Sequence, residues 1–212
     1  MQKLYIIGAG GFGREVLGWA RQCPLCGSEW IIGGFIDDNN RLIGKQIHGV
    51  EVVSNLEDYY INGREVFICA IGDPEIKKKI CSSILDKGGK FINIIHPSVV
   101  LGHNVQIGSG VILCPNVVIT CDVTISNFVT INIGTTIGHD SYIGSWVTIS
   151  PGCNVSGGTI LKEGSFLGSN VTILPKAQVG AYSTVGAGGT VLKRVADRTI
   201  VFGNPASEIM KK

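Results

Sequence analysis

The sequence predicts two domains: a small α/β domain of Rossmann-like type over residues 1–95, followed by a parallel β-helix with a C-terminal tail over residues 96–212. Two observations lead to this fold class. Every sixth residue from Leu101 to Val191 is Leu, Ile or Val, which is the repeat of a solenoid with three strand-like sides per coil of about eighteen residues. Before residue 95, strand-like runs alternate with helical segments, as in a parallel sheet with crossover helices.

Two further columns of the repeat support the β-helix. Two positions before each aliphatic residue stands a small or β-branched residue, such as Val99 or Cys153, which suits a packed, pleated surface. Three positions after it, Gly, Asn or Asp dominates, as at Asn104 and Gly134. These residues tolerate the positive φ that a tight corner requires. Each residue therefore has a defined place, and departures from the repeat are candidates for function.

The first domain is expected to alternate strands and helices along the chain. We expect strands at residues 4–7, 30–36, 66–71 and 90–95, and helices at 14–22 and 74–85. Pro74 is favourable in the first turn of its helix, because the N–H that proline lacks has no helical partner there. The resulting fold is a small βαβ-type parallel sheet.

The segment from Gly8 to Gly13 matches GxGxxG between the first strand and the first helix. Glycines there let a phosphate approach backbone N–H groups at a helix N-terminus. A dinucleotide domain needs two mononucleotide halves, and 95 residues hold about one, so a nucleotide sugar fits better than NAD. The expected substrate-binding residues follow the ends of neighbouring strands or lie in the loop: Gly10, Gly11, Phe12, Asp37, Asp38, Gly72 and Asp73. For the Asp pair, a solvated turn before Asn39 is the alternative.

Composition excludes several classes of protein. With 44% hydrophobic and 16% charged residues and a net charge of +2, the chain is globular and has no basic stripe for nucleic acid. No apolar run approaches a membrane span and no signal peptide is visible, so we expect a cytoplasmic protein. The seven cysteines are then expected to be reduced. The lone CxxC at Cys23 and Cys26 lacks the second ligand pair of a zinc site.

Two of the four histidines, His103 and His139, share one column of the repeat, two coils apart. The gamma-class carbonic anhydrases, which share this solenoid, bind zinc with three histidines, two of them at this spacing. Their third ligand falls five residues after the second, where this chain has Gly144. A three-ligand zinc set is therefore absent, and no metal is expected.

Four segments together resemble the bacterial sugar O-/N-acyltransferases, over essentially the whole chain: Ile6–Gly11 (IIGAGG), Ile71–Asp73 (IGD), Ile131–Asp140 (INIGTTIGHD) and Gly203–Ala206 (GNPA). That family includes sialic-acid O-acetyltransferases and nucleotide-4-amino-sugar N-acetyltransferases. The resemblance implies a left-handed β-helix, acetyl-CoA as the acyl donor, a homotrimer and active sites between subunits.

The resemblance also implies roles for individual residues. His139 would be the general base, with Asp140 orienting its ring, although Asp140 also occupies a corner position where Asp is simply tolerated. Asn132 would lie near the acceptor sugar. Acetyl-CoA would be held by Thr148, Gly157, Ser169 and Ala187, the N–H of Gly157 stabilising the thioester oxygen. Two positions depart from the family, because Thr148 and Phe12 replace histidines that many relatives carry.

We therefore expect an acetyl-CoA-dependent N-acetyltransferase acting on the amine of a nucleotide-linked amino sugar in surface glycan biosynthesis. The nearest alternative is O-acetylation of a sialic acid or a related sugar hydroxyl. A structural or surface-binding solenoid is less suitable, because it has no need of a nucleotide-type domain. An NAD-dependent enzyme would lack the second nucleotide half and a residue set for hydride transfer.

Overall fold

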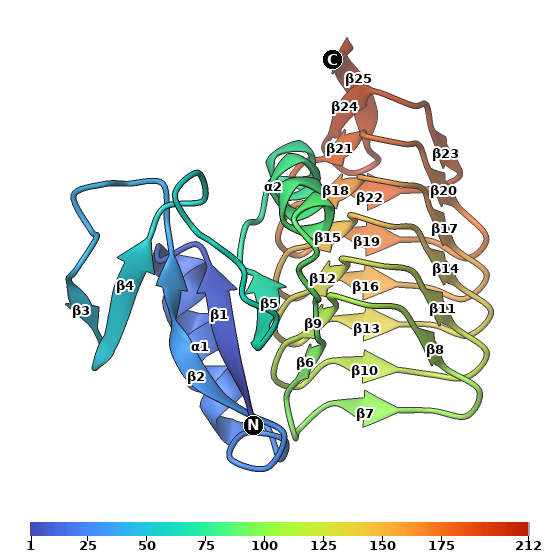
Figure 1. Ribbon diagram of the computed structural model, residues 1–212. Helices are drawn as coiled ribbons and strands as arrows, with labels where there is room; N and C mark the ends of the chain where they lie inside the picture. Colours follow the sequence, from blue (N-terminus) through green and yellow to red (C-terminus); the bar gives the residue numbers. More distant parts are fainter. Residues whose placement is uncertain (212) are drawn as a thin grey trace. The chain divides into compact units, whose positions relative to one another are not determined.

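The computed structural model describes residues 1–211. The chain divides into two compact units, one made of residues 1–72 with 76–97 and the other of residues 73–75 with the residues from 98 onward. Figure 1 shows an α/β unit and a three-sided stack of coils. Neither helix in the described residues has the length and apolar character needed to cross a membrane.

The α/β unit contains one mostly parallel sheet with the strand order β3-β4-β2-β1-β5. Its strands are β1 (Gln2–Ile7), β2 (Trp30–Ile36), β3 (Gln46–Ile47), β4 (Val50–Ser54) and β5 (Glu65–Cys69). β1 pairs in parallel with β2 on one side and with β5 on the other. The order therefore reverses at β1, which is the place where open α/β sheets bind ligands beyond the carboxyl ends of their strands.

Two helices accompany the sheet: α1 (Gly11–Gln22) and α2 (Pro74–Asp86). Helix α1 begins three residues earlier than expected. Gly10 adopts an extended conformation, with φ −72° and ψ −162°, and its carbonyl already accepts the N–H of Arg14 at 3.1 Å. The glycine loop therefore leads directly into the helix, with Gly11 as its first residue.

The prediction of one continuous strand over residues 90–95 is wrong. The structure has only a single bridge from Phe91 to Phe67 in this region, followed by the short strand β6 (Ile94–Ile95). The backbone hydrogen bonds here run from the Phe67 N–H to Lys90 and from the Ile92 N–H to Phe67, so only Phe91 pairs with the sheet. The sequence analysis also missed β3 and β4, where β4 extends the sheet beside β2.

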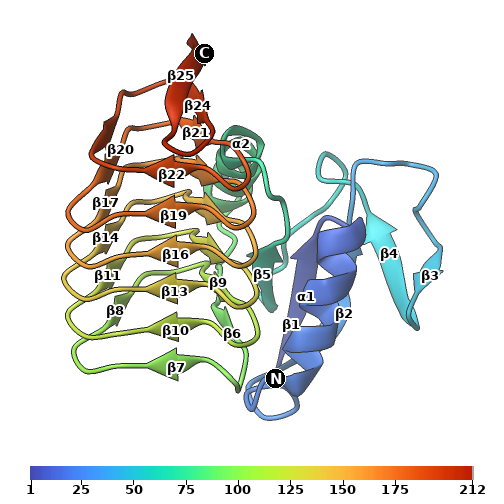
Figure 2. The same cartoon turned by 180° about the vertical axis from the view of Figure 1, so that it is seen from behind.

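The second unit is a parallel β-helix, as the repeat predicts (Figures 1 and 2). One face stacks β22-β19-β16-β13-β10-β7, and the next stacks β23-β20-β17-β14-β11-β8. On the third face β9, β12, β15, β18, β21 and β24 follow one another. The strands are β7 (Val100–Leu101), β8 (Gln106–Ile107), β9 (Ile112–Leu113), β10 (Val118–Ile119), β11 (Thr124–Ile125), β12 (Thr130–Ile131), β13 (Thr136–Ile137), β14 (Tyr142–Ile143), β15 (Thr148–Ile149), β16 (Asn154–Val155), β17 (Ile160–Leu161), β18 (Phe166–Leu167), β19 (Thr172–Ile173), β20 (Gln178–Val179), β21 (Thr184–Val185), β22 (Thr190–Val191), β23 (Arg194–Val195), β24 (Thr199–Phe202) and β25 (Ser207–Lys211).

The aliphatic column forms the core of the solenoid. Each of its members from Leu113 to Val191 is at most 2% exposed, whereas Leu101, in the first coil, is 42% exposed. The last two strands, β24 and β25, pair antiparallel beyond the final coil. Burying one aliphatic side chain per side contributes roughly 1.5–3 kcal/mol each, so the core follows from the six-residue period.

The corners adopt positive φ, as expected, but not only at Gly, Asn and Asp. Phe128 (φ 59°), Trp146 (φ 67°) and Tyr182 (φ 52°) also do so. The rings of Phe128 and Trp146 stack one coil apart, with centroids 4.2 Å apart and planes inclined by 3°. The Tyr182 hydroxyl donates to Glu163 at 2.6 Å. Contacts between successive coils therefore compensate for a backbone conformation that is unfavourable for large side chains.

Candidate active site

His139 and Asp140 form the corner between β13 and β14. His139 Nδ1 lies 2.7 Å from Asp140 Oδ2, and the two side chains are 65% and 67% exposed. When Nδ1 carries its proton and donates it to Asp140, Nε2 keeps the lone pair that a general base needs. Asp140 also has a positive φ of 58°. It therefore meets both expectations at once, as a corner residue and as the partner of the imidazole, while its catalytic role stays a prediction.

Gly157 lies one coil after His139 and faces its ring. A Cβ added to Gly157 would fall 2.6 Å from Nε2, 2.7 Å from Cε1 and 3.0 Å from Cδ2 of His139. The coils are locked together here, because the Gly158 N–H donates to the His139 carbonyl at 2.7 Å. The absence of a side chain at Gly157 therefore leaves the space that the imidazole occupies.

A second acidic residue beside the imidazole was missed by the sequence analysis. Asp122 stands one coil before Asp140 in the same column, and its Oδ1 accepts the Asn104 amide at 2.8 Å. This hydrogen bond, together with one from Cys121 and the nearby charges of His103 and His139, holds the pKa of Asp122 below its usual range. The eighteen-residue spacing from Asp140 was the signal that could have identified it.

The sheet formed by β7, β10, β13, β16, β19 and β22 carries most of the predicted solenoid residues along its two edges, and we call it the site face. His139 and Gly157 follow this face at one corner, while Asn132, Ser169 and Ala187 precede it at the other. The Asn132 carboxamide is partly used at its own corner, where Oδ1 accepts the Ile133 N–H at 2.8 Å. The predicted base therefore shares one edge of this face with Gly157, while the other two predicted donor residues on it, Ser169 and Ala187, lie on the opposite edge.

Thr148 does not join this group. It belongs to β15 on another face of the solenoid and is only 6% exposed. Because it follows His139 by nine residues, half of an eighteen-residue coil, the two residues lie on opposite sides of the same chain. The structure therefore does not bring Thr148 to the imidazole within one chain.

In the α/β unit, Asp37 holds the glycine loop. Its Oδ2 accepts the Ala9 N–H at 2.7 Å, and its Oδ1 accepts the Asn39 N–H at 2.9 Å. Gly13 must lack a side chain, because a Cβ there would collide with the Gly8 carbonyl, whereas a Cβ on Gly10 would meet no atom within 4 Å. The loop is thus held by Asp37 on one side, and the space beside Gly10 is free, as a phosphate-binding loop requires.

Phe12 packs against Trp19 in an edge-on contact with ring centroids 6.0 Å apart. It is half-buried and has no polar group for a ligand. Gly72 and Asp73 are exposed between the end of β5 and the start of α2, beyond the carboxyl end of the sheet. These placements are compatible with the predicted substrate contacts, which stay predictions.

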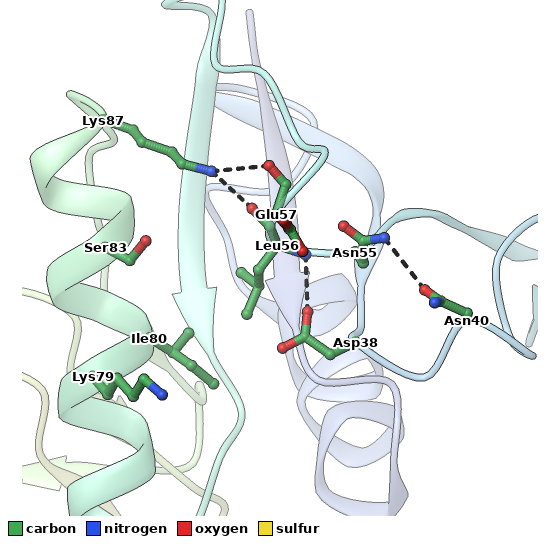
Figure 3. A pocket seen from close by; sticks show the side chains of 9 residues that line it. All are labelled: Asp38, Asn40, Asn55, Leu56, Glu57, Lys79, Ile80, Ser83 and Lys87. Carbon is green, nitrogen blue, oxygen red and sulfur yellow. Dashed lines mark hydrogen bonds between the residues drawn. The ribbon is translucent and has the colours of Figure 1, made fainter.

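Asp38 lines a cavity of about 660 Å³ between helix α2 and the segments that follow β2 and β4 (Figure 3). Its Oδ1 accepts the Leu56 N–H at 2.9 Å. Lys87 closes one end by donating to the carbonyls of Leu56 (2.8 Å) and Glu57 (3.4 Å). Lys79 and Ile80 line the helix side. The cavity has the size of a small-ligand site, and its walls offer carboxylates, amides and the ammonium groups of two lysines.

No group of three or more His, Cys, Asp or Glu side chains arranged to hold a metal ion is found within residues 1–211. The cysteines in this part of the chain are all free thiols.

Comparisons with known proteins agree with both units. Residues 3–84 match the family model of the PglD N-terminal domain. The GDP-perosamine N-acetyltransferase of Escherichia coli O157:H7 is 36% identical over 147 residues, which are 67% of this chain. The match spans 64% of that relative, slightly less than two thirds of its length.

Two solved structures are similar over nearly the whole chain. PerB from Caulobacter crescentus, in complex with CoA and GDP-perosamine, has a TM-score of 0.88 and 28% identity, over 99% of this chain and 98% of that one. The acetyltransferase domain of PglB from Neisseria gonorrhoeae FA1090 has a TM-score of 0.89 and 28% identity, over 99% and 100%. The predicted fold class, including the left-handedness of the β-helix, is thereby confirmed. Residues 3–84 thus match the PglD N-terminal domain family, and the chain as a whole is similar to sugar N-acetyltransferases that carry such a domain before a β-helix.

Proposed function

We propose that the protein transfers an acetyl group from acetyl-CoA to the amine of a nucleotide-linked amino sugar, as a step of surface glycan biosynthesis. The observation that carries this proposal is the His139–Asp140 pair, at 2.7 Å, standing over Gly157 on the edge of a solenoid of this family. Because acetyl-CoA and nucleotide sugars are cytoplasmic metabolites, the proposal places the reaction in the cytoplasm.

The chemistry follows from this arrangement. Nε2 of His139 accepts a proton from the sugar amine as the nitrogen attacks the thioester carbonyl carbon. The N–H of Gly157 stabilises the oxygen as it becomes anionic. The carbon–sulfur bond then breaks, the proton passes from the imidazole to the CoA sulfur, and an amide and free CoA result. Asp140 stabilises the imidazolium that forms between these steps.

The α/β unit would hold the nucleotide of the acceptor. The diphosphate would lie above Gly10 and Gly11 at the start of α1, where backbone N–H groups and the helix dipole favour negative charge. The base or ribose would reach the cavity beside Asp38 (Figure 3). The structure of PerB in complex with both CoA and GDP-perosamine supports an enzyme that binds a nucleotide sugar and the acyl donor at the same time.

We propose that the working enzyme is a homotrimer with sites between subunits. Support comes from Thr148, which lies across the coil from His139, so that both can serve one acetyl-CoA only if they come from different copies. Sedimentation at micromolar concentration tests the assembly directly. A monomer that is fully active would rule out the shared site.

The acceptor class is tested by CoA release. Purified protein is incubated with acetyl-CoA and a panel of UDP-, dTDP- and GDP-linked 4-amino sugars, and free thiol is measured over time. We expect turnover with at least one member and none with the corresponding hydroxyl sugars. Turnover only with a sialic acid would favour O-acetylation instead, and no turnover with any acceptor would refute the proposed activity.

A further inference from the structure

A hollow of about 320 Å³ lies on the site face, over β13 and its neighbours β10 and β16. Its polar lining comes from Thr120, Thr136, Asn154 and Ser156. Gly138 also lines it and separates Thr120 from Ser156, which occupy the same position one coil below and one coil above. Gly138 lets the coils approach closely here, because a Cβ on it would lie 2.5 Å from the Gly157 nitrogen, and His139 is the next residue in the chain.

The hollow has a defined place relative to the reacting groups. It lies between the two edges of the site face, with Asn132 at the corner before β13 and His139 at the corner after it. The lining reaches Gly138, so the hollow ends next to the residue that carries the imidazole. The volume lies at the lower end of the range for small-molecule sites, about 300–1,000 Å³, which suits a single sugar ring rather than a whole nucleotide.

The polar groups of the hollow offer both acceptors and donors. The Thr120 hydroxyl donates to the Ile137 carbonyl at 3.2 Å, and the Thr136 hydroxyl donates to Asn154 Oδ1 at 3.1 Å, so both hydroxyl oxygens keep acceptor capacity toward a ligand. Asn154 Nδ2 has only a long contact of 3.5 Å to the Gly152 carbonyl and keeps donor capacity.

None of the residues that line the hollow carries a charge. A phosphate group therefore has no cation to meet there. Neutral hydroxyl groups, each of which can donate and accept, match the lining best.

We propose that this hollow binds the pyranose ring of the acceptor, and that Thr136 and Asn154 hydrogen-bond its hydroxyls so that the amine faces His139. This inference rests on the proposed function for its substrate, but it concerns a different part of the chain from the nucleotide domain. Thr136 and Asn154 are then specificity-determining residues for the sugar, while the α/β unit reads the nucleotide.

The test distinguishes the contribution of the sugar to binding from that of the nucleotide. Dissociation constants for GDP and for GDP-perosamine, the ligand bound by PerB, are measured by calorimetry, and their ratio gives the contribution of the sugar. Thr136→Val removes one hydroxyl at nearly constant shape, and Asn154→Leu removes the amide. Thr172→Val is the matched control, because Thr172 occupies the same outward position in the next coil but does not line the hollow.

We expect each lining variant to weaken GDP-perosamine roughly 2- to 10-fold, the usual range for one neutral hydrogen bond, and to leave GDP and acetyl-CoA binding unchanged. Thr172→Val should match the wild type, and thermal unfolding confirms that all variants are folded. A rise in the dissociation constant for acetyl-CoA instead would assign the hollow to the donor. Equal binding of GDP and GDP-perosamine by the wild type would also overturn the inference.

The proposed function can fail independently of this result. If GDP-perosamine binds with a sugar contribution that the variants reduce, yet no CoA is released with any acceptor, the hollow is a sugar site and the acetyl transfer is wrong. If CoA is released but the variants bind and turn over like the wild type, the acetyl transfer stands and the hollow is refuted as the sugar site.

Discussion

Replacing Gly157 by Ala should disable the base without unfolding the protein. The added Cβ would lie 2.6–3.0 Å from three ring atoms of His139, whereas ordinary contacts are about 3.5–4.0 Å. The ring must therefore retreat by about 1 Å, which breaks or tilts its 2.7 Å hydrogen bond to Asp140. Gly157 is not among the positive-φ residues, so its backbone accepts alanine, and the N–H that we expect to contact the thioester is kept.

The size of the effect follows from these distances. A displacement of about 1 Å in a reacting group can lower the rate about 100-fold, which corresponds to about 2.7 kcal/mol of transition-state stabilisation. The stability of the fold should change by less than about 1 kcal/mol, because an alanine that fits the backbone even restricts the unfolded chain. The exposed imidazole can move into solvent instead of straining the core.

The assay is CoA release under saturating substrates, together with thermal unfolding of the same samples. The control is the Gly157→Ala change made in a His139→Ala background. If Gly157 acts by leaving space for the imidazole, Gly157→Ala should cause almost no further loss of activity in the variant that lacks the ring. Near-normal turnover of Gly157→Ala, or penalties that add in the double variant, would refute the reasoning.

Three further predictions concern the base, the nucleotide loop and the corner stack. His139→Ala should lower kcat at least about 100-fold, because base catalysis contributes about 10²–10⁴-fold, with no loss of folded protein in circular dichroism; an active variant would remove His139 from the mechanism. Asp37→Ala should weaken acceptor binding by about 1–3 kcal/mol, seen as a raised KM, since the glycine loop loses its bond at Ala9, while the KM for acetyl-CoA stays constant; the opposite pattern would contradict the assignment of domains. Trp146→Gly should lower the melting temperature less than Trp146→Ala, because alanine keeps the strain of a positive φ, about 1–2 kcal/mol; the reverse order would show that strain is unimportant at this corner.

The period of six made the solenoid predictable, because a buried column of the repeat accepts only a few types of residue, mainly Leu, Ile and Val. From Leu113 onward each member of that column is almost fully buried. The corners were less predictable. The rule that favours Gly, Asn or Asp concerns backbone strain alone, and it cannot foresee that Phe128 and Trp146 stabilise the same conformation by stacking on each other.

The repeat also placed His139 and Gly157 in one column, but it could not show that the ring rests on the glycine. Nor could spacing show that Asp37 turns its carboxylate toward Ala9 while Asp38 turns toward Leu56. Successive residues at a strand end differ in direction, and that direction depends on loops brought in by tertiary contacts. The expected strand over 90–95 failed for a related reason, since β-propensity at Phe91 was satisfied by a single bridge.

Stacked coils set distances along the edges of the site face in fixed steps. Ser169 and Ala187 stand one eighteen-residue coil apart on one edge, and each coil advances the chain by about 4.8 Å. If Ser169 and Ala187 hold acetyl-CoA, as we expect, the solenoid would set the length of acyl carrier that fits along this edge. Inserting or deleting a whole coil between Gly157 and Ala187 would change the length of carrier that fits by one step and leave the chemistry at both ends intact. In such a scaffold the number of coils would set the carrier length, and single substitutions in the hollow would change the sugar that is accepted.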